Sequence, residues 1–188
     1  GDNTPLVYSQ NPQHLYYSAN FYLVSLLVET NHGCSDYVYD SVEVYSVPDP
    51  FFSFKDTCYN DTFSFHDLST SVQGNIIFWE WDFGDGSPKR YTQNAKYVYS
   101  THALYNASLT VATNKGCTNT VEIPVKAYPV PVPDYSQLYQ CEKQEIRFTE
   151  DGYVNSLFGS SVVKWKWKFG DGDSAANFDV AHLSLIHI

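Results

Sequence analysis

The sequence predicts an all-β protein, built from antiparallel β-sandwiches that follow one another in tandem. Apolar and polar residues alternate in short segments, which is typical of half-buried strands. Aromatic residues, mostly Tyr and Phe, make up 17% of the 188 residues, and these residue types favour the pleated surface of a sheet. Long parts of the sequence also recur at nearly constant spacing, which indicates repeated structural units.

The strands of the best-defined region can be placed in order. The alternating segments are residues 62–66, 79–83, 107–112 and 121–125. In residues 79–83 the aromatic side chains share one face, and the two carboxylates between them take the other. Residues 84–86 and 114–116 supply glycines for tight turns. Short strands separated by such turns predict an antiparallel sandwich.

The repetition is visible as two matches in consistent order. Residues 11–58 match residues 94–141 at an offset of 83, with 18 identities in 48 positions. Residues 78–86 match residues 164–172 at an offset of 86, so three residues are inserted in the loop before Trp165. We therefore expect each unit to contain about 83 residues.

Two short proline-rich segments, 48–50 and 129–133, are interpreted as joints, because proline stiffens a connection and resists regular structure. They divide the chain into the back part of one unit, a complete unit and the front part of a third, at residues 1–47, 48–130 and 131–188. The chain is thus expected to be a window on a longer array. Residues 183–188 depart from the repeated pattern and are interpreted as a non-native tail.

A motif stands at the centre of the complete unit and returns in the third. Its residues are Trp79, Trp81, Asp82, Phe83, Gly84, Asp85 and Gly86, and then Trp165, Trp167, Phe169, Gly170, Asp171 and Gly172. With the Tyr-Val-Tyr segment and the alternating strand that follow, it resembles the PKD (polycystic kidney disease) domain. The third unit departs from the motif, because Lys168 replaces the first aspartate.

The resemblance implies an immunoglobulin-like β-sandwich. The Gly-Cys turn at 116–117 and the early cysteine at 58 resemble tandem PKD repeats in secreted and surface proteins of Bacteroidota, including gliding-type adhesins. That likeness implies an extracellular or cell-surface location.

Charge and hydropathy exclude several classes of partner. Eleven basic and 21 acidic residues give a net charge of −10, which argues against binding nucleic acid or anionic lipid. The best apolar run, residues 21–28, is far too short to insert into a membrane. The expected partners are neighbouring repeats of the same chain and surface glycans or proteins.

No catalytic, cofactor-binding or metal-binding residue is assigned from the sequence. Asp82 and Asp85 suggest a carboxylate pair for acid–base catalysis or Ca²⁺, but a role in holding the glycine turn is the favoured interpretation. Asp171 and Asp173 lack the spacing of a calcium loop. Five aromatic residues suggest a stacking surface for sugars, although a core role is favoured for the tryptophans: Trp79, Trp81, Tyr91, Tyr97 and Tyr99.

The four cysteines, Cys34, Cys58, Cys117 and Cys141, are expected to form disulfides in an extracellular array. No Cys-x-x-Cys is present, which argues against zinc. The immunoglobulin-like topology implied by the resemblance places Cys58 and Cys117 at opposite ends of one sandwich. One remaining option joins the early cysteine of one unit to the turn cysteine of the next; the connectivity stays open.

Taken together, the sequence predicts a non-catalytic, extracellular structural or adhesive segment. The alternative is an accessory module of an extracellular glycan hydrolase or protease.

Overall fold

The computed structural model describes residues 1–188 except 1, 3, 139–144, 177–179 and 184–188. The structured part of the described chain is almost all β-strand, and its central region is an antiparallel β-sandwich, so the predicted all-β, antiparallel-sandwich fold is confirmed. A single 3-10 turn, Leu157–Gly159, is the one helical element among the described residues. No helix in this described part is long and apolar enough to cross a membrane.

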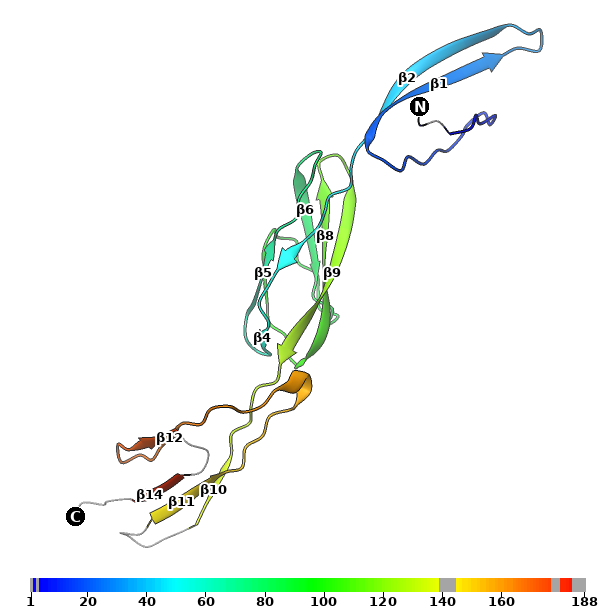
Figure 1. The fold of residues 1–188 in the computed structure, drawn as a ribbon. Helices are drawn as coiled ribbons and strands as arrows, with labels where there is room; N and C mark the ends of the chain where they lie inside the picture. The colour runs from blue at the N-terminus through cyan, green and yellow to red at the C-terminus, as the bar shows by residue number, and fades with distance from the viewer. Residues whose placement is uncertain (1, 3, 139–144, 177–179, 184–188) are drawn as a thin grey trace.

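Figure 1 shows an elongated molecule. A hairpin lies at one end, a sandwich in the middle and an open group of short strands at the other end.

The central sandwich consists of a three-stranded and a four-stranded sheet. The first has the order β3-β5-β7, with β3 at Phe52–Ser53, β5 at Phe63–Asp67 and β7 at Ala95–Tyr97. The second has the order β4-β9-β8-β6, with β4 at Thr57–Cys58, β6 at Ile76–Asp82, β8 at Ala103–Thr113 and β9 at Thr118–Tyr128.

One pairing in this sandwich is parallel. The two residues of β4 run parallel to the end of β9, where Cys58 pairs with Tyr128. The remaining pairings of the central sheets are antiparallel, as expected from the short turns. The sequence pattern does not reveal this short parallel contact, because the two strands are far apart in the chain.

The core lies between the two sheets and is mostly aromatic. Fully buried side chains come from both sheets and the loops between them: Phe52, Phe63, Phe65, Trp81, Phe83, Tyr99, Leu109, Val111 and Val125. Tyr99 is buried to its hydroxyl, which donates a hydrogen bond of 3.0 Å to the carbonyl of Phe83. The buried hydroxyl is therefore not left without a partner, which would be costly.

The N-terminal hairpin repeats the geometry of the central one. Strands β1 (Asn20–Glu29) and β2 (Ser35–Val44) pair over ten positions. When 83 is added to the residue numbers, every residue pair of β1 and β2 becomes a residue pair of β8 and β9. In both turns the glycine N–H donates a 3.0 Å hydrogen bond to the threonine carbonyl three residues earlier.

The N-terminal hairpin differs from the central one in its burial. Tyr22 is the only buried residue among the described residues of 1–47.

The C-terminal part repeats the opposite half of the central sandwich. It contains a sheet of order β10-β11-β14, at Tyr135–Gln137, Glu145–Glu150 and Val180–Leu183, and a pair of short strands, β12 at Trp167–Lys168 and β13 at Ser174–Ala175. Tyr135 pairs with Glu150 as Phe52 pairs with Asp67.

Ring packing repeats in the same way. Phe148 lies 5.8 Å from Trp167 and 5.3 Å from Phe169, and in the centre Phe65 lies 5.7 Å from Trp81 and 5.3 Å from Phe83. The C-terminal part thus has the ring arrangement of a sandwich half.

The predicted non-native tail begins at Leu183. That residue still belongs to β14, which pairs with β11, so the backbone follows the repeated pattern to this point. Residues 184–188 lie outside the described residues.

Candidate functional site

The glycine-rich motif forms a tight turn held by its own carboxylates. Gly84 and Gly86 have positive φ angles of 76° and 79°, which glycine adopts without a steric cost. Asp82 accepts a 3.0 Å hydrogen bond from the N–H of Gly84, and Asp85 accepts one of 3.1 Å from the N–H of Ser87. Both carboxylates are therefore engaged with the backbone of the turn.

Asp85 also joins the turn to β7. The hydroxyl of Tyr97 donates a hydrogen bond of 2.5 Å to its second oxygen. Burial raises the pKa of Asp85, but the hydrogen bonds from Tyr97 and Ser87 outweigh burial, so the pKa lies below its ordinary value. Burial and the bond to Asp85 raise the pKa of Tyr97. Asp85 therefore stays ionised and Tyr97 stays neutral near pH 7.

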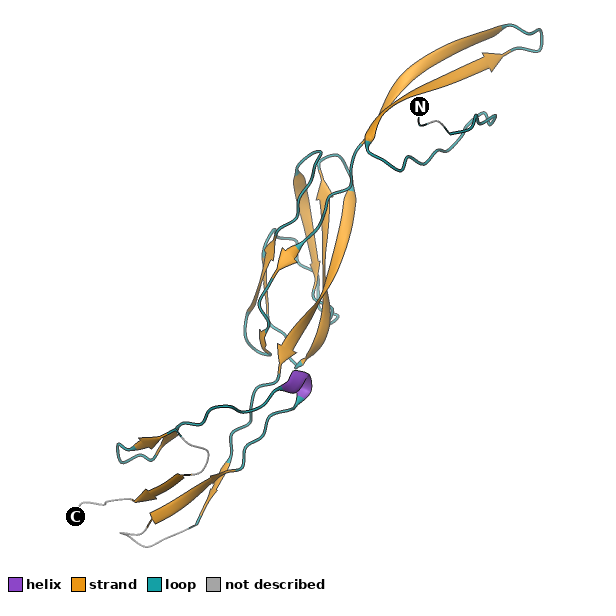
Figure 2. Cartoon of the chain, viewed as in Figure 1, coloured by secondary structure: helices purple, strands orange, loops and turns teal. Residues whose placement is uncertain are grey.

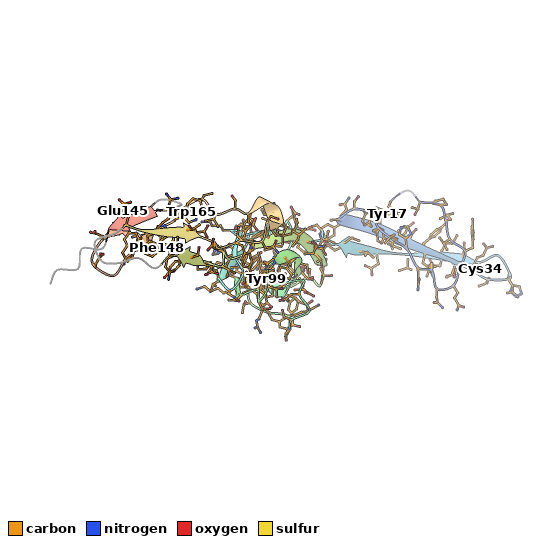
Figure 3. All side chains as sticks on the ribbon, turned by 90° about the horizontal axis from the view of Figure 1, so that it is seen from below. Tyr17, Cys34, Tyr99, Glu145, Phe148 and Trp165 are labelled. Atoms are coloured by element: carbon orange, nitrogen blue, oxygen red, sulfur yellow. The ribbon has the colours of Figure 1, made fainter. Side chains whose placement is uncertain are left out.

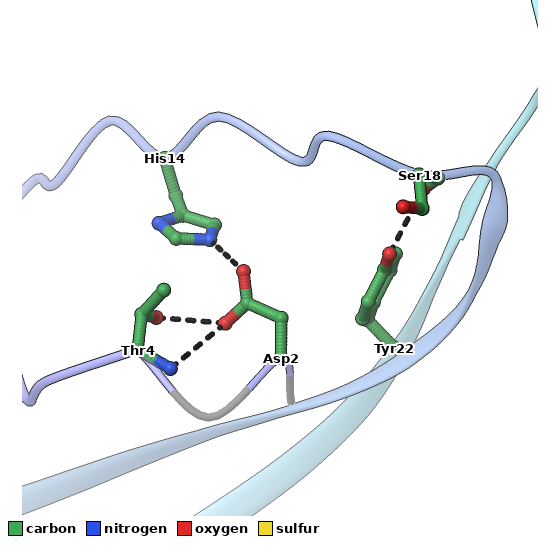
Figure 4. Close-up of polar contacts among 5 residues, drawn as sticks. All are labelled: Asp2, Thr4, His14, Ser18 and Tyr22. Carbon is green, nitrogen blue, oxygen red and sulfur yellow. Dashed lines mark hydrogen bonds and ion pairs between the residues drawn. The ribbon is translucent and has the colours of Figure 1, made fainter.

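The same contact occurs in the N-terminal part, at the offset of 83 residues (Figure 4). Asp2 lies 2.6 Å from the ring nitrogen of His14 and accepts hydrogen bonds from the N–H and hydroxyl of Thr4. The hydrogen bonds from Thr4 and His14 hold the pKa of Asp2 well below its ordinary value. Asp2, Thr4 and His14 thus occupy the places of Asp85, Ser87 and Tyr97.

The C-terminal copy of the turn keeps part of this arrangement. Asp171 accepts a 3.1 Å hydrogen bond from the N–H of Asp173, as Asp85 does from Ser87. Lys168 stands in place of Asp82, so this position has no carboxylate to accept a hydrogen bond from the N–H of Gly170.

The turn carboxylates are held by the backbone of the turn. Within the described residues, no group of three or more His, Cys, Asp or Glu side chains lies close enough to hold a metal ion. Asp82 and Asp85 instead fix the chain where it passes from β6 to the loop before β7.

The five aromatic residues considered for sugar stacking do not share a surface. Trp81 and Tyr99 are fully buried, so a stacking surface that includes them is wrong. Trp79 is half-buried, and its indole N–H donates a 2.7 Å hydrogen bond to Asp67 on β5. Of the five, only Tyr91 is largely exposed, at 61%.

A different aromatic pair is exposed on the outside of the sandwich. The rings of Phe78 and Tyr91 lie 5.9 Å apart, and Phe78 is 40% exposed. Glu80, two residues further along β6, forms an ion pair of 2.5 Å with Lys89. The register shift between Ile76 and Phe78 is a bulge, and from Phe78 to Asp82 the register is unbroken, so Phe78 lies on the outer face with Glu80 and Asp82. Sequence alternation offered no signal for this bulge.

Of the described cysteines, Cys58 and Cys117 lie at opposite ends of the central sandwich, and Cys34 does not. Cys34 is exposed at the tip of the N-terminal hairpin (Figure 3). The sulfur of Cys117 lies 3.9 Å from the carbonyl oxygen of Tyr45, which belongs to the N-terminal part. Cys58 pairs with Tyr128 at the other end of the sandwich. All three are free thiols in the structure, and Cys141 lies outside the described residues.

Each joint is also held by side chains. The ammonium of Lys115 lies 4.5 Å from the ring centre of Tyr45, and Gln73 accepts a 2.9 Å hydrogen bond from the N–H of Ser46. At the other end Phe158 packs against Tyr128, with ring centres 5.9 Å apart. Phe158 stands in the longer loop of the third copy, so that loop contacts the central sandwich.

The central sandwich matches a known protein family. Residues 50–127 match the family model of the PKD domain. The matched segment is the sandwich itself, and it includes the turn motif described above.

Three solved structures are similar to parts of the chain. The PKD1 domain of Vibrio anguillarum Epp is 26% identical, covers 45% of this chain and 96% of its own, and has a TM-score of 0.42. The PKD1 domain from the Vibrio cholerae metalloprotease PrtV is 26% identical, covers 44% and 98%, and has a TM-score of 0.41. A structure from a study of carbohydrate-binding modules of the β-sandwich superfamily is 16% identical, covers 56% and 55%, and has a TM-score of 0.43.

Proposed function

We propose that the chain is a non-catalytic structural segment of an extracellular or cell-surface bacterial protein. Its units are PKD-like sandwiches in tandem: the back of one at 1–47, a complete one at 48–130 and the front of another at 131–188. Such units would space or present other modules, and the length of the array would grow with the number of units.

The observation that carries this proposal is the repetition of geometry around a PKD-like sandwich. The hairpin β1–β2 has the register of β8–β9, and the strand pair β10–β11 has the register of β3–β5. The family match at residues 50–127 supports a PKD-like central unit, and the repeated register extends that proposal to the other two parts.

The reading frame around the chain tests the proposal. Further units at a spacing of about 83 residues on both sides would support the structural array. A catalytic domain in the same frame would favour the alternative, an accessory module of an extracellular glycan hydrolase or protease. Protease shaving of intact cells, followed by detection of peptides from 48–130, tests the location; protection from the protease would contradict it.

The position of the cysteines supports a covalent staple at each joint. Under the repeat, Tyr45 of the first unit corresponds to Tyr128, and Cys58 is the neighbour of Tyr128 in the central unit. The early cysteine of the first unit would then stand beside Tyr45, and Tyr45 is in contact with Cys117. The early cysteine of each unit and the turn cysteine of the next would form the disulfide.

Peptide mapping without reduction tests this pairing in a chain that carries whole neighbouring units. A peptide that links the cysteines of consecutive units is the expected result. A link between Cys58 and Cys117 of the same unit would overturn it.

A second role, contact with glycans, is favoured by the exposed pair of Phe78 and Tyr91. Aromatic faces stack on the apolar faces of sugars, and a neighbouring ion pair such as Glu80–Lys89 offers hydrogen bonds. On a glycan array, binding that Tyr91→Ala removes and the exposed control Leu104→Ala retains would support this role. Equal binding by both variants would exclude it.

A further inference from the structure

A polar groove runs beside β5, on the side of the central sandwich that faces away from β9 (Figure 1). Along β5, Ser64 and His66 alternate with the buried Phe63 and Phe65, so they point away from the core. The groove has a volume of about 490 Å³, and seven side chains line it: Ser53, Phe54, Lys55, Thr57, Thr62, Ser64 and His66.

The groove is basic, although the chain as a whole has a net charge of −10. Lys55 and His66 line it, and no aspartate or glutamate does. Lys96 on β7 pairs with Ser64, so its side chain lies on the same face of the sheet. Within the described part of the chain, neither Lys55 nor Lys96 forms an ion pair. The lysines of this face are therefore not neutralised by a salt bridge.

The carboxylates next to these residues in the sequence are engaged with other groups. Asp56 accepts a 2.9 Å hydrogen bond from a backbone N–H of β9, and Asp67 accepts one of 2.7 Å from the indole of Trp79. Asp61 accepts a hydrogen bond of 3.3 Å from the hydroxyl of Thr57. These carboxylates thus hold the chain around the groove, and none of the three lines it.

Phe54 gives the groove an apolar patch that is fixed in position. Its ring centre lies 5.9 Å from that of Phe52 and 5.5 Å from that of Phe65, and both of these rings are buried. Phe54 itself is half-buried and lines the groove. One side of the ring is therefore held by the core, while the ring contributes to the groove.

The basic and aromatic residues of the groove are not needed for the strand pairing beneath it. The pair β10–β11 has the same register as β3–β5. At the offset of 83 residues the third part has Gln137, Leu138 and Thr149 where the groove has Phe54, Lys55 and His66. The same pairing thus forms without the ring and without the two basic side chains.

We propose that this groove binds an acidic glycan, whose carboxylate or sulfate group is held by Lys55 and His66. Hydrogen bonds between a cation and an anion are stronger than neutral ones, and the imidazole N–H is a further donor. The ring of Phe54 packs against the apolar face of a sugar ring. A glycan is favoured over an acidic peptide, because four hydroxyl side chains line the groove and match the hydroxyl groups of a sugar. The site lies on the opposite sheet from Phe78, and it does not depend on the tandem arrangement of the units.

Biolayer interferometry with the whole chain tests the proposal on immobilised polygalacturonate, dextran sulfate and neutral dextran. We expect binding to one or both of the acidic polymers and about tenfold or more weaker binding to dextran. Binding to polygalacturonate alone would assign the groove to carboxylates, and binding to dextran sulfate alone would assign it to sulfates.

Lys55→Gln should weaken that binding by about tenfold, the loss expected for one charge-assisted hydrogen bond. The matched control is Lys166→Gln, the same change at an exposed lysine of the third part, and it should bind like the parent. Thermal unfolding should show the same stability for both variants, because both side chains are exposed.

Three results would overturn the proposal. They are equal losses for Lys55→Gln and Lys166→Gln, equal binding of dextran and the acidic polymers, and tighter binding of polyglutamate than of either acidic glycan. Failure to bind any of these polymers would also overturn it. None of these results bears on the number or spacing of units in the reading frame, so the proposed structural role is tested separately.

Discussion

At the residue scale, burial separates side chains that look alike in the sequence. Leu104 and Leu109 both lie on β8, but Leu104 is 53% exposed and Leu109 is fully buried against the aromatic core. Their contributions to stability must therefore differ, although both are leucines of one strand.

Leu109→Ala should destabilise the central sandwich by about 2–5 kcal/mol, because it removes buried contacts and leaves a cavity. Leu104→Ala should change the free energy of unfolding by no more than about 0.5 kcal/mol. Denaturant unfolding followed by tryptophan fluorescence measures both. Similar losses for the two variants would contradict the burial described here.

Asp85 gives the turn a pH dependence. Its pKa is lowered in the folded state from an ordinary value of 3.8, so it binds fewer protons there than in the unfolded chain near that pH. The stability that it contributes is present above pH 3.8 and is lost as the pH falls through the lower, folded value. Asp85→Asn should abolish this component of the acid dependence, and Tyr97→Phe should reduce it. Unfolding curves from about pH 6 down to about pH 2 provide the measurement, and slopes identical to that of the parent would refute the role of Asp85.

At the element scale, the turn after β6 is built around two glycines with different surroundings. A Cβ atom on Gly84 would lie 2.4 Å from the carbonyl oxygen of Asn106 on β8. A Cβ atom on Gly86 would meet nothing within 4 Å. Both glycines have positive φ, a backbone conformation that is unfavourable for residues with a Cβ atom. A larger residue at either position should therefore destabilise the fold.

Gly86→Ala should therefore cost about 1–2 kcal/mol, the backbone term alone. Gly84→Ala should cost about 3 kcal/mol or more, because the obstructing atom belongs to a central strand and cannot move aside. Thermal unfolding of the two variants side by side tests the order. A smaller loss for Gly84→Ala than for Gly86→Ala would show that the turn does not pack on β8 as described.

The sequence predicted most of these elements but not their irregularities. Alternation placed the strands at 62–66 and 107–112 close to the observed β5 and β8. It did not place the bulge at Ile76–Phe78 or the parallel pairing of β4, since both depend on contacts with strands that are distant in the chain. The contact between Phe78 and Tyr91 was missed because it joins β6 to the loop that follows it, and alternation says nothing about where a loop packs.

At the scale of the whole molecule, the parts follow one another along a line (Figure 1). The contacts at the joints are few: a cation–π contact and hydrogen bonds at Tyr45 and Ser46, and, at the other end, contacts of Phe158 with Tyr128 and Lys126. An extended arrangement has a larger radius of gyration than a compact domain with the same number of residues.

Small-angle X-ray scattering should therefore give a radius of gyration well above about 16 Å, the value for a compact chain of 188 residues. A value near the compact one would mean that the ends fold back on the sandwich.

What the sequence alone determined is the kind of element and its repetition. Period-two alternation, the glycine turns and the offset of 83 residues are local or self-comparing signals, so they need no knowledge of what packs against what. Only the tertiary structure decided which aromatic side chains are buried and that Cys117 lies against Tyr45. Those facts depend on contacts between residues far apart in the chain, and no window of sequence contains both partners.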